Sequence, residues 1–392
     1  SRGQEAADSA RIREIAGNLE NIKISGYVHA LFQKASAPGI SSFSGGPFEE
    51  DVDQRFTVRR GRMKLTYDAG LSSAVVQIDA TEQGVIIRDA YVRMTEPRWK
   101  TFGLQAGVQN RSFGHEVAFS SSRRETPERS RLFQTLFSGE RDAGVKVFAE
   151  PPAESALGFL QAELGFYNGS GTISDYDSSK DLIARLHAGF EGRERPWTLG
   201  LGVSLYSGGQ RQNSRYRYEM TGSNDHFSID SAESNIGRTA KRRYYGADLQ
   251  VSWEFPFGKS ALRSEYITGQ QPGSSSSSRT PRSRPDEATY VREFEGAYAV
   301  FIQQLGNSPL EAIVKYDFYD PNRDVRSAGI NGNFAEGDIL FSTWGYGLAW
   351  KYDEHITFTA YYEAVRNEHT ALEGFEEDVS DNVLSLRLQY VF

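Results

Sequence analysis

The last segment of the chain alternates apolar and polar side chains up to its final residue. Residues 384–392 carry leucine, tyrosine or phenylalanine at every second position, with Ser385, Arg387 and Gln389 among the residues between them. Successive side chains of a β-strand point to opposite faces, so this spacing predicts a strand with one apolar and one polar face. The same alternation recurs along the whole chain, and this recurrence predicts an all-β fold.

Sixteen period-2 segments follow one another after the first ~20 residues. Most have the ~9–11 residues that a tilted strand needs to cross a bilayer. The predicted strands are 22–34, 54–67, 73–81, 85–94, 101–110, 142–150, 156–167, 181–192, 197–208, 243–255, 260–269, 291–305, 310–319, 338–352, 355–366 and 379–392.

The connections between these segments alternate between short and long. Short ones contain turn residues, as at Pro256-Phe257-Gly258, whereas long ones include 111–141 and 209–242, with a short exception at 82–84. Bacterial membrane barrels place short turns in the periplasm and long loops outside. We therefore expect residues 22–392 to form a closed 16-stranded antiparallel transmembrane β-barrel with extracellular long loops and periplasmic termini. A soluble β-sandwich or propeller is the alternative.

The composition agrees with this location. The chain is only 38% hydrophobic, yet 12% of its residues are aromatic, and no apolar run approaches the ~18 residues of a spanning helix. The absence of cysteine fits an oxidising compartment. The C-terminal strand with its aromatic last residue resembles the signature read by the bacterial outer-membrane assembly machinery. We expect an integral protein of a bacterial outer membrane, and the net charge of −8 argues against nucleic acid as a partner.

Segment 54–67 breaks its own alternation. Its apolar residues lie at even positions up to Val58 and at odd positions from Met63 onward. A β-bulge near Arg59-Arg60-Gly61-Arg62 would restore the two faces. The same bulge would turn several basic side chains inward together.

Three short motifs resemble those of a known family. Residues 56–65 (FTVRRGRMKL), 76–79 (VQID) and 88–92 (RDAYV) resemble the phosphate-selective porins O and P. The resemblance implies a sixteen-stranded barrel that assembles as a homotrimer.

The resemblance also implies which side chains line the pore. Arg59 and Arg60 match arginines of the family's constriction, Asp89 matches its constriction aspartate, and residues 111–141 match a third loop that folds into the lumen. Lysine, which is abundant in the funnel of phosphate-selective members, is sparse in this chain. The resemblance therefore implies a preference for small anions such as phosphate rather than strict phosphate specificity.

Segment 111–141 interleaves arginines and glutamates. Guanidinium groups around a narrow pore attract anions by Coulomb forces and bidentate hydrogen bonds, and facing carboxylates would create a transverse field. A solvated surface loop is the alternative. The candidate constriction residues are Arg59, Arg60, Arg62 and Asp89 on the wall and Glu116, Arg123, Arg124, Glu125, Glu128, Arg129 and Arg131 in the segment.

Other long connections also carry distinctive charge. Arg211, Arg215 and Arg217 predict a basic row along a vestibule, with an exposed hairpin or a trimer contact as the alternatives. Acidic residues gather in connections 35–53 and 367–378, which adjoin where the barrel closes. They could bind divalent cations shared with lipopolysaccharide, or form a solubilising rim.

Residues 1–21 are predicted to form a separate periplasmic segment. Ile12, Ile15, Leu19 and Ile22 form a short heptad-like stripe. So short a helix is unstable alone, so we expect it to join a small coiled coil in a trimer, to lie on the barrel base or to plug it. No signal-peptide pattern is visible, and we expect the sequence to be that of a mature or trimmed chain.

No pattern points to catalysis. The six histidines show no metal-ligand spacing, and Asn168-Gly169-Ser170-Gly171 lacks the pattern of a nucleophile elbow. We therefore expect neither an enzyme nor a cofactor or metal. The predicted function is passive diffusion of small hydrophilic solutes with a preference for anions.

Two other functions remain open. One is a general or carbohydrate porin, which would be favoured by an aromatic track along the lumen through Tyr91, Tyr206, Tyr319 and Tyr361. The other is a structural or adhesive barrel blocked by segment 111–141.

Overall fold

The computed structural model describes residues 19–192, 196–220, 226–281 and 283–392, and most of them belong to one closed antiparallel sheet. Each barrel strand pairs with its neighbours along the chain, β9 pairs with β12, and β18 pairs with β1 to close the barrel. The sixteen barrel strands are β1 (Ile22–Ala35), β2 (Gln54–Asp68), β3 (Ser72–Thr81), β4 (Gly84–Thr95), β5 (Phe102–Asn110), β6 (Arg141–Ala149), β7 (Leu160–Tyr167), β8 (Asp181–Glu191), β9 (Trp197–Arg211), β12 (Thr239–Phe255), β13 (Gly258–Gly273), β14 (Thr289–Gln304), β15 (Leu310–Asp320), β16 (Phe341–Lys351), β17 (Ile356–Asn367) and β18 (Val383–Val391).

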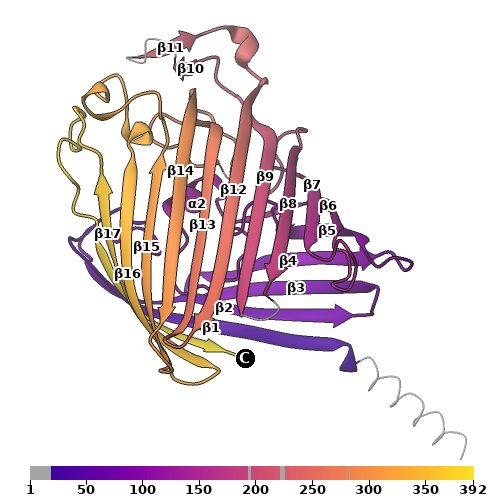
Figure 1. Cartoon of the computed structure of the whole chain (residues 1–392). Helices are drawn as coiled ribbons and strands as arrows, with labels where there is room; N and C mark the ends of the chain where they lie inside the picture. The colour runs from indigo at the N-terminus through magenta and orange to yellow at the C-terminus, as the bar shows by residue number, and fades with distance from the viewer. Residues whose placement is uncertain (1–18, 193–195, 221–225, 282) are drawn as a thin grey trace, which may run out of the picture.

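The long connections carry the remaining elements. Strands β10 (Arg217–Met220) and β11 (Phe227–Asp230) form a hairpin that lies beyond the ends of β9 and β12, at the end of the barrel opposite the C-terminus (Figure 1). The helical elements are α2 (Arg131–Leu136), η1 (Glu233–Asn235), η2 (Ser327–Gly329) and η3 (Glu336–Asp338). Among the described residues, no helix is long and apolar enough to cross a membrane.

The alternation of the sequence separates an apolar outer wall from a polar lumen. On β18, Leu386 is 44% exposed and faces outward, whereas Arg387 is 3% exposed and faces the interior. This arrangement is the reverse of a water-soluble protein, and a closed barrel also leaves no sheet edge at its seam. The wall is therefore suited to contact with lipid.

The prediction of sixteen barrel strands with short and long connections is confirmed, but some strand starts differ. β7 begins at Leu160 rather than at 156, because consecutive turns occupy the preceding residues: Ser155 N donates to Pro152 O at 2.9 Å and Gly158 N donates to Ser155 O at 3.0 Å. Similarly, η3 delays the start of β16 to Phe341. Residues that bond within turns cannot at the same time join the ladder.

The predicted N-terminal helix lies almost entirely outside the described residues. Residues 19 and 20 are helical, and β1 begins at Ile22 as predicted.

Candidate functional site

Residues 111–140, which connect β5 to β6, bond to strands on several sides of the barrel. Gly114 N donates to Ser204 Oγ of β9 at 3.0 Å, and the carbonyl of Ser122 accepts from Gln389 of β18 at 3.0 Å. Arg59 of β2 donates to Glu128 at 2.7 Å. Because β9 lies far around the barrel from β18 and β2, the segment that contacts all three strands crosses the interior.

Part of the interior is filled with aromatic and aliphatic side chains. α2 is too short to be stable by itself, and its buried residues pack into a core formed with the wall. Phe113 reaches Gly246, where a Cβ atom would come within 2.8 Å of its ring. The core includes Leu132, Phe133, Leu136 and Phe137 from the segment and Tyr206, Tyr244, Phe294, Tyr298, Tyr319 and Tyr361 from the wall.

Two polar cavities remain on the side of β2 to β6. The outer cavity has a volume of about 450 Å³ and lies near the long connections, since Pro47 and Arg279 of two such connections contribute to its lining. The inner cavity has a volume of about 480 Å³ and lies toward the opposite end of the barrel, where Ser25 near the start of β1 and the C-terminal Phe392 contribute.

The two cavities adjoin at Arg62 and Arg129, which line both. Arg62 projects from β2 and its Nε donates to Asp79 at 2.8 Å. Arg129 comes from the inward segment, and its Nε donates to the carbonyl of Glu116 at 2.9 Å. Two guanidinium groups, one from the wall and one from the segment, therefore mark the junction.

Basic side chains outnumber acidic ones around this pair of cavities. The eleven basic residues are Arg59, Arg60, Arg62, Lys64, Arg88, Arg93, Arg111, Arg129, Arg141, Lys146 and Arg279. The five acidic residues are Asp79, Asp89, Glu128, Glu140 and Glu163. The lining is thus net positive although the whole chain is net negative.

Ion pairs hold the inward segment against this wall. Glu128 accepts from Arg59 and Arg60, each at 2.7 Å. Glu140 contacts three arginines: Arg88, Arg129 and Arg141. Burial alone would raise the pKa of both glutamates, but the surrounding guanidinium groups hold each pKa well below its usual range. Both carboxylates therefore stay charged across the physiological pH range.

Two β-bulges supply arginines to the cavities. In the pairing of β1 with β2, His29 opposes Arg60 and Ala30 opposes Val58, so Arg59 is the extra residue. This confirms the bulge predicted from the broken alternation. A second bulge was not predicted: the pairing of β3 with β4 skips Arg88. A bulge places two neighbouring residues opposite one, which brings an additional side chain to the lumen.

Six of the predicted constriction residues line the cavities: Arg59, Arg60, Arg62, Asp89, Glu128 and Arg129. Asp89 is bonded by Arg141, whose Nε donates to it at 3.1 Å. These residues come from β2, β4 and the inward segment.

The other five predicted constriction residues line neither cavity. Arg123 is exposed and lies over the ring of Phe119, while Arg124 is buried against carbonyls of the segment itself. The remaining three serve other contacts: Glu116 accepts from Ser130 at the start of α2, Glu125 pairs with Arg263, and Arg131 pairs with Asp381.

The predicted vestibule arginines lie at the end of the barrel that carries the long connections. Arg211 ends β9 and is exposed. Arg215 pairs with Glu233, and Arg217 pairs with Glu219 on the same strand. Two of the three charges are thus balanced locally.

Several lining residues were missed at the level of sequence. Lys64 follows Arg62 by two residues, and Arg93 follows Asp89 by four, so the period of the strands already placed them on the lumenal face. Lys146 of β6 also lines the inner cavity. Arg279 belongs to a long connection, where no periodicity indicates in which direction a side chain points. Within the described part of the chain, no group of three or more potential ligands is arranged to hold a metal ion.

No protein-family model matches the sequence, and no curated protein sequence matches it. Solved structures do share its fold. An anion-selective porin from Comamonas acidovorans has 10% sequence identity and a TM-score of 0.56 over 95% of this chain and 99% of that one. OprB from Pseudomonas putida has 9% identity and a TM-score of 0.62 over 95% and 94%. The trimer form of OmpT, an outer membrane protein of Vibrio cholerae, has 10% identity and a TM-score of 0.52 over 95% and 99%. At such identities the likeness is one of fold.

Proposed function

We propose that this protein is a porin of a bacterial outer membrane, through which small hydrophilic solutes diffuse passively, with a preference for small anions such as phosphate. The excess of basic side chains around two adjoining lumenal cavities carries the proposal. In cavities this small, a solute lies within the ~8 Å screening length of the lining charges. The local charge therefore outweighs the net −8 of the chain.

The junction at Arg62 and Arg129 supports oxyanion passage in particular. A guanidinium group offers donors in a planar fork that matches the oxygens of phosphate and carboxylate. Both side chains already bond protein acceptors, so a passing anion competes with fixed partners and is not held for long.

The orientation follows from the connections and the apolar outer wall. We assign the long connections to the extracellular side, and the start of β1 and the end of β18 to the periplasm. Solved structures of the same fold include outer-membrane proteins and a porin described as anion-selective, which supports both the location and the solute class. A passive channel needs no catalytic group, and we assign none.

The two alternative functions have less support. A carbohydrate channel would use exposed aromatic residues along the lumen, but Tyr206, Tyr319 and Tyr361 are buried in the core beside α2, and only Tyr91 of the four predicted residues lines a cavity. A blocked structural barrel is opposed by the two cavities, which occupy the side that the core leaves free.

We further propose that the protein forms a homotrimer in contact with outer-membrane lipids, including lipopolysaccharide. β2 pairs with β1 from Gln54 but with β3 only from Arg62, so residues 54–61 have no ladder partner on that side. The carboxylate of Glu82 accepts from Val58 N at 3.1 Å, and Phe56 is 84% exposed. An unpaired edge is costly in hydrocarbon, and a neighbouring copy would cover it.

Reversal potentials in a planar bilayer under a potassium chloride gradient test the function directly. We expect single channels whose reversal potential has the same sign as the chloride equilibrium potential. A cation-selective channel would show that the acidic residues govern the passage, and an electrically silent barrel would favour the blocked alternative.

A further inference from the structure

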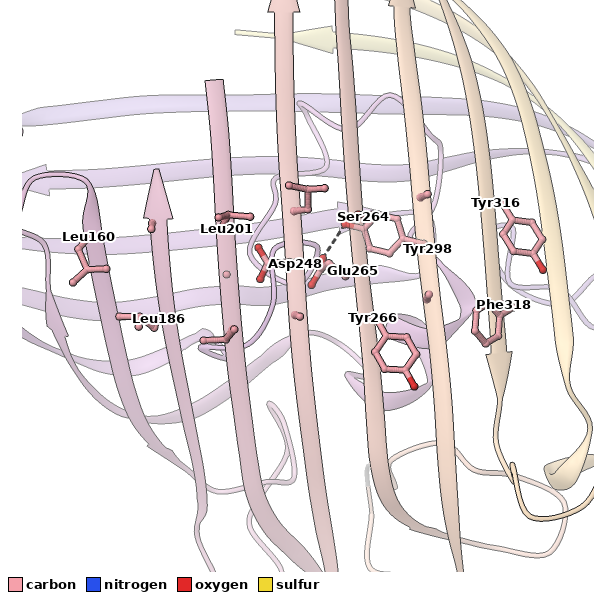
Figure 2. Close-up of a pocket in the computed structure, with 17 residues that line it drawn as sticks. Leu160, Leu186, Leu201, Asp248, Ser264, Glu265, Tyr266, Tyr298, Tyr316 and Phe318 are labelled. Carbon is pink, nitrogen blue, oxygen red and sulfur yellow. Dashed lines mark hydrogen bonds between the residues drawn. The ribbon is translucent and has the colours of Figure 1, made fainter. Parts of the chain in front are cut away.

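The outer wall carries an apolar groove on the side away from the unpaired edge of β2. It spans β7 to β15 and has a volume of about 800 Å³ (Figure 2). The sheet register sets its outward-facing lining residues in two rows. One row contains Leu160, Ala188, Leu201, Leu249, Ser264, Ala299 and Tyr316, and the other contains Leu186, Val203, Ala247, Tyr266, Ala297 and Phe318.

The shape of the groove comes from the sizes of these side chains. Ala247 of β12 and Ala297 and Ala299 of β14 have small side chains and leave the wall low on either side of β13. Tyr316 and Phe318 of β15 form an aromatic side, and Leu186 of β8 and Leu201 of β9 form the opposite side (Figure 2). A depression lined by apolar atoms on a lipid-facing wall fits a hydrocarbon chain.

A basic patch lies above the groove, toward the long connections. On β12, Lys241 and Arg243 are exposed. Arg242, which lies between them, and Tyr244, which follows, are almost completely buried in the interior. The exposed pair therefore faces outward. Arg211 of β9 opposes Thr239, so it lies on the same face near Lys241. Lys180 immediately precedes the first residue of β8 on this side.

The patch is in register with the groove. Arg243 precedes Ala247 by four residues on the same strand, which corresponds to about 13 Å at ~3.3 Å per residue. The outward residue between them is Tyr245, which is 55% exposed. Aromatic side chains of this kind mark the level of the lipid headgroups in membrane barrels.

Most of the positive charge in the patch is unbalanced. Among residues that the structure describes, Arg211, Lys241 and Arg243 have no ion-pair partner, while Lys180 pairs with Asp175 at 2.7 Å. The nearest outward acidic residues on the wall are Glu293 and Glu295 of β14. Glu295 is itself paired with Arg326 at 2.9 Å, and Glu293 accepts from Gln270 at 3.2 Å.

We propose that the basic patch (Lys180, Arg211, Lys241 and Arg243) and the apolar groove together bind one lipid A moiety of lipopolysaccharide. Phosphate groups contact the patch, and an acyl chain lies in the groove. The proposal rests on the proposed orientation, because the long connections then put the patch in the outer leaflet. Charge complementarity selects this occupant: unpaired cations suit a lipid that carries two phosphates and several acyl chains.

Native mass spectrometry of the delipidated protein in mild detergent tests the proposal, with purified bisphosphorylated lipid A as the probe. The variant Lys241→Gln/Arg243→Gln removes charge from the patch, and Ala247→Leu/Ala297→Leu fills the groove. Arg98→Gln/Lys100→Gln is the matched control, since these exposed residues lie in the short connection between β4 and β5. We expect lipid A to bind about tenfold more weakly to each of the first two variants and normally to the control.

Two further probes separate the possible lipids. Dephosphorylated lipid A should lose most of its affinity, and phosphatidylglycerol should bind more weakly than lipid A. Equal binding of lipid A to all variants, or equal affinity for phosphatidylglycerol, would overturn the proposal. The unheated electrophoretic mobility of each variant reports its folding. Channel selectivity should be unchanged in the patch variant, so loss of lipid binding and failure of the porin function are measured separately.

Discussion

Replacing Lys64 with glutamine tests whether ions pass through the inner cavity. Lys64 lies on β2 and lines this cavity, and it forms no ion pair with another residue that the structure describes. Its replacement therefore removes one lumenal charge without breaking a contact of the inward segment. Lys241→Gln is the control, because it removes the same charge from the outward face of β12.

The expected effect follows from the size of the cavity. A sphere of about 480 Å³ has a radius of about 5 Å, and at ~5 Å two unit charges interact by roughly 0.8 kcal/mol in water and by about 3 kcal/mol at an effective dielectric constant of ~20. With a screening length of about 10 Å in 0.1 M salt, the lower value becomes ~0.5 kcal/mol. Because chloride loses this stabilisation while potassium loses the same repulsion, the permeability ratio of chloride to potassium should fall at least about fivefold.

Reversal potentials in a salt gradient give this ratio for the unmodified protein and both variants. The control should leave the ratio unchanged. If Lys64→Gln also leaves the ratio within about twofold, ions do not pass within the screening length of this cavity, and the assignment of the passage is wrong.

Three other outcomes are expected. Replacing both Arg59 and Arg60 with alanine should shift reversal potentials toward cations and increase current fluctuations, because the segment carboxylate that they share loses both partners. Burial and nearby arginines lower the pKa of His115 to about 4, so a released segment binds a proton more readily than a packed one. Acidification from pH 6.5 to 4 should therefore weaken its packing by up to about 3 kcal/mol, seen as protease sensitivity that His115→Gln reduces. Finally, Phe56→Lys should yield monomers in native mass spectrometry, whereas Leu201→Lys on the opposite wall should keep the trimer; trimers in both would refute the proposed contact at β2.

The barrel follows from the order of apolar and polar residues along the chain. The spacing of two between apolar residues fixes which face each side chain occupies, and a closed barrel is the arrangement of such strands that satisfies the backbone in lipid. The broken alternation between Val58 and Met63 even located the bulge at Arg59, because only an extra residue restores the faces of that strand. Such local rules also placed Lys64 and Arg93 in the lumen, although they were not recognised there.

Which charges of segment 111–140 line the cavities depends on contacts between residues that are far apart in the chain. Arg124 and Arg129 are both buried arginines of this segment, yet only Arg129 lines the cavities. The segment has no regular period, so the direction of each side chain is set by distant contacts, such as the packing of α2 on the aromatic wall and the pairs of Glu128 with β2. A pattern of neighbouring residues cannot encode these contacts, because they join positions that become adjacent only when the barrel closes.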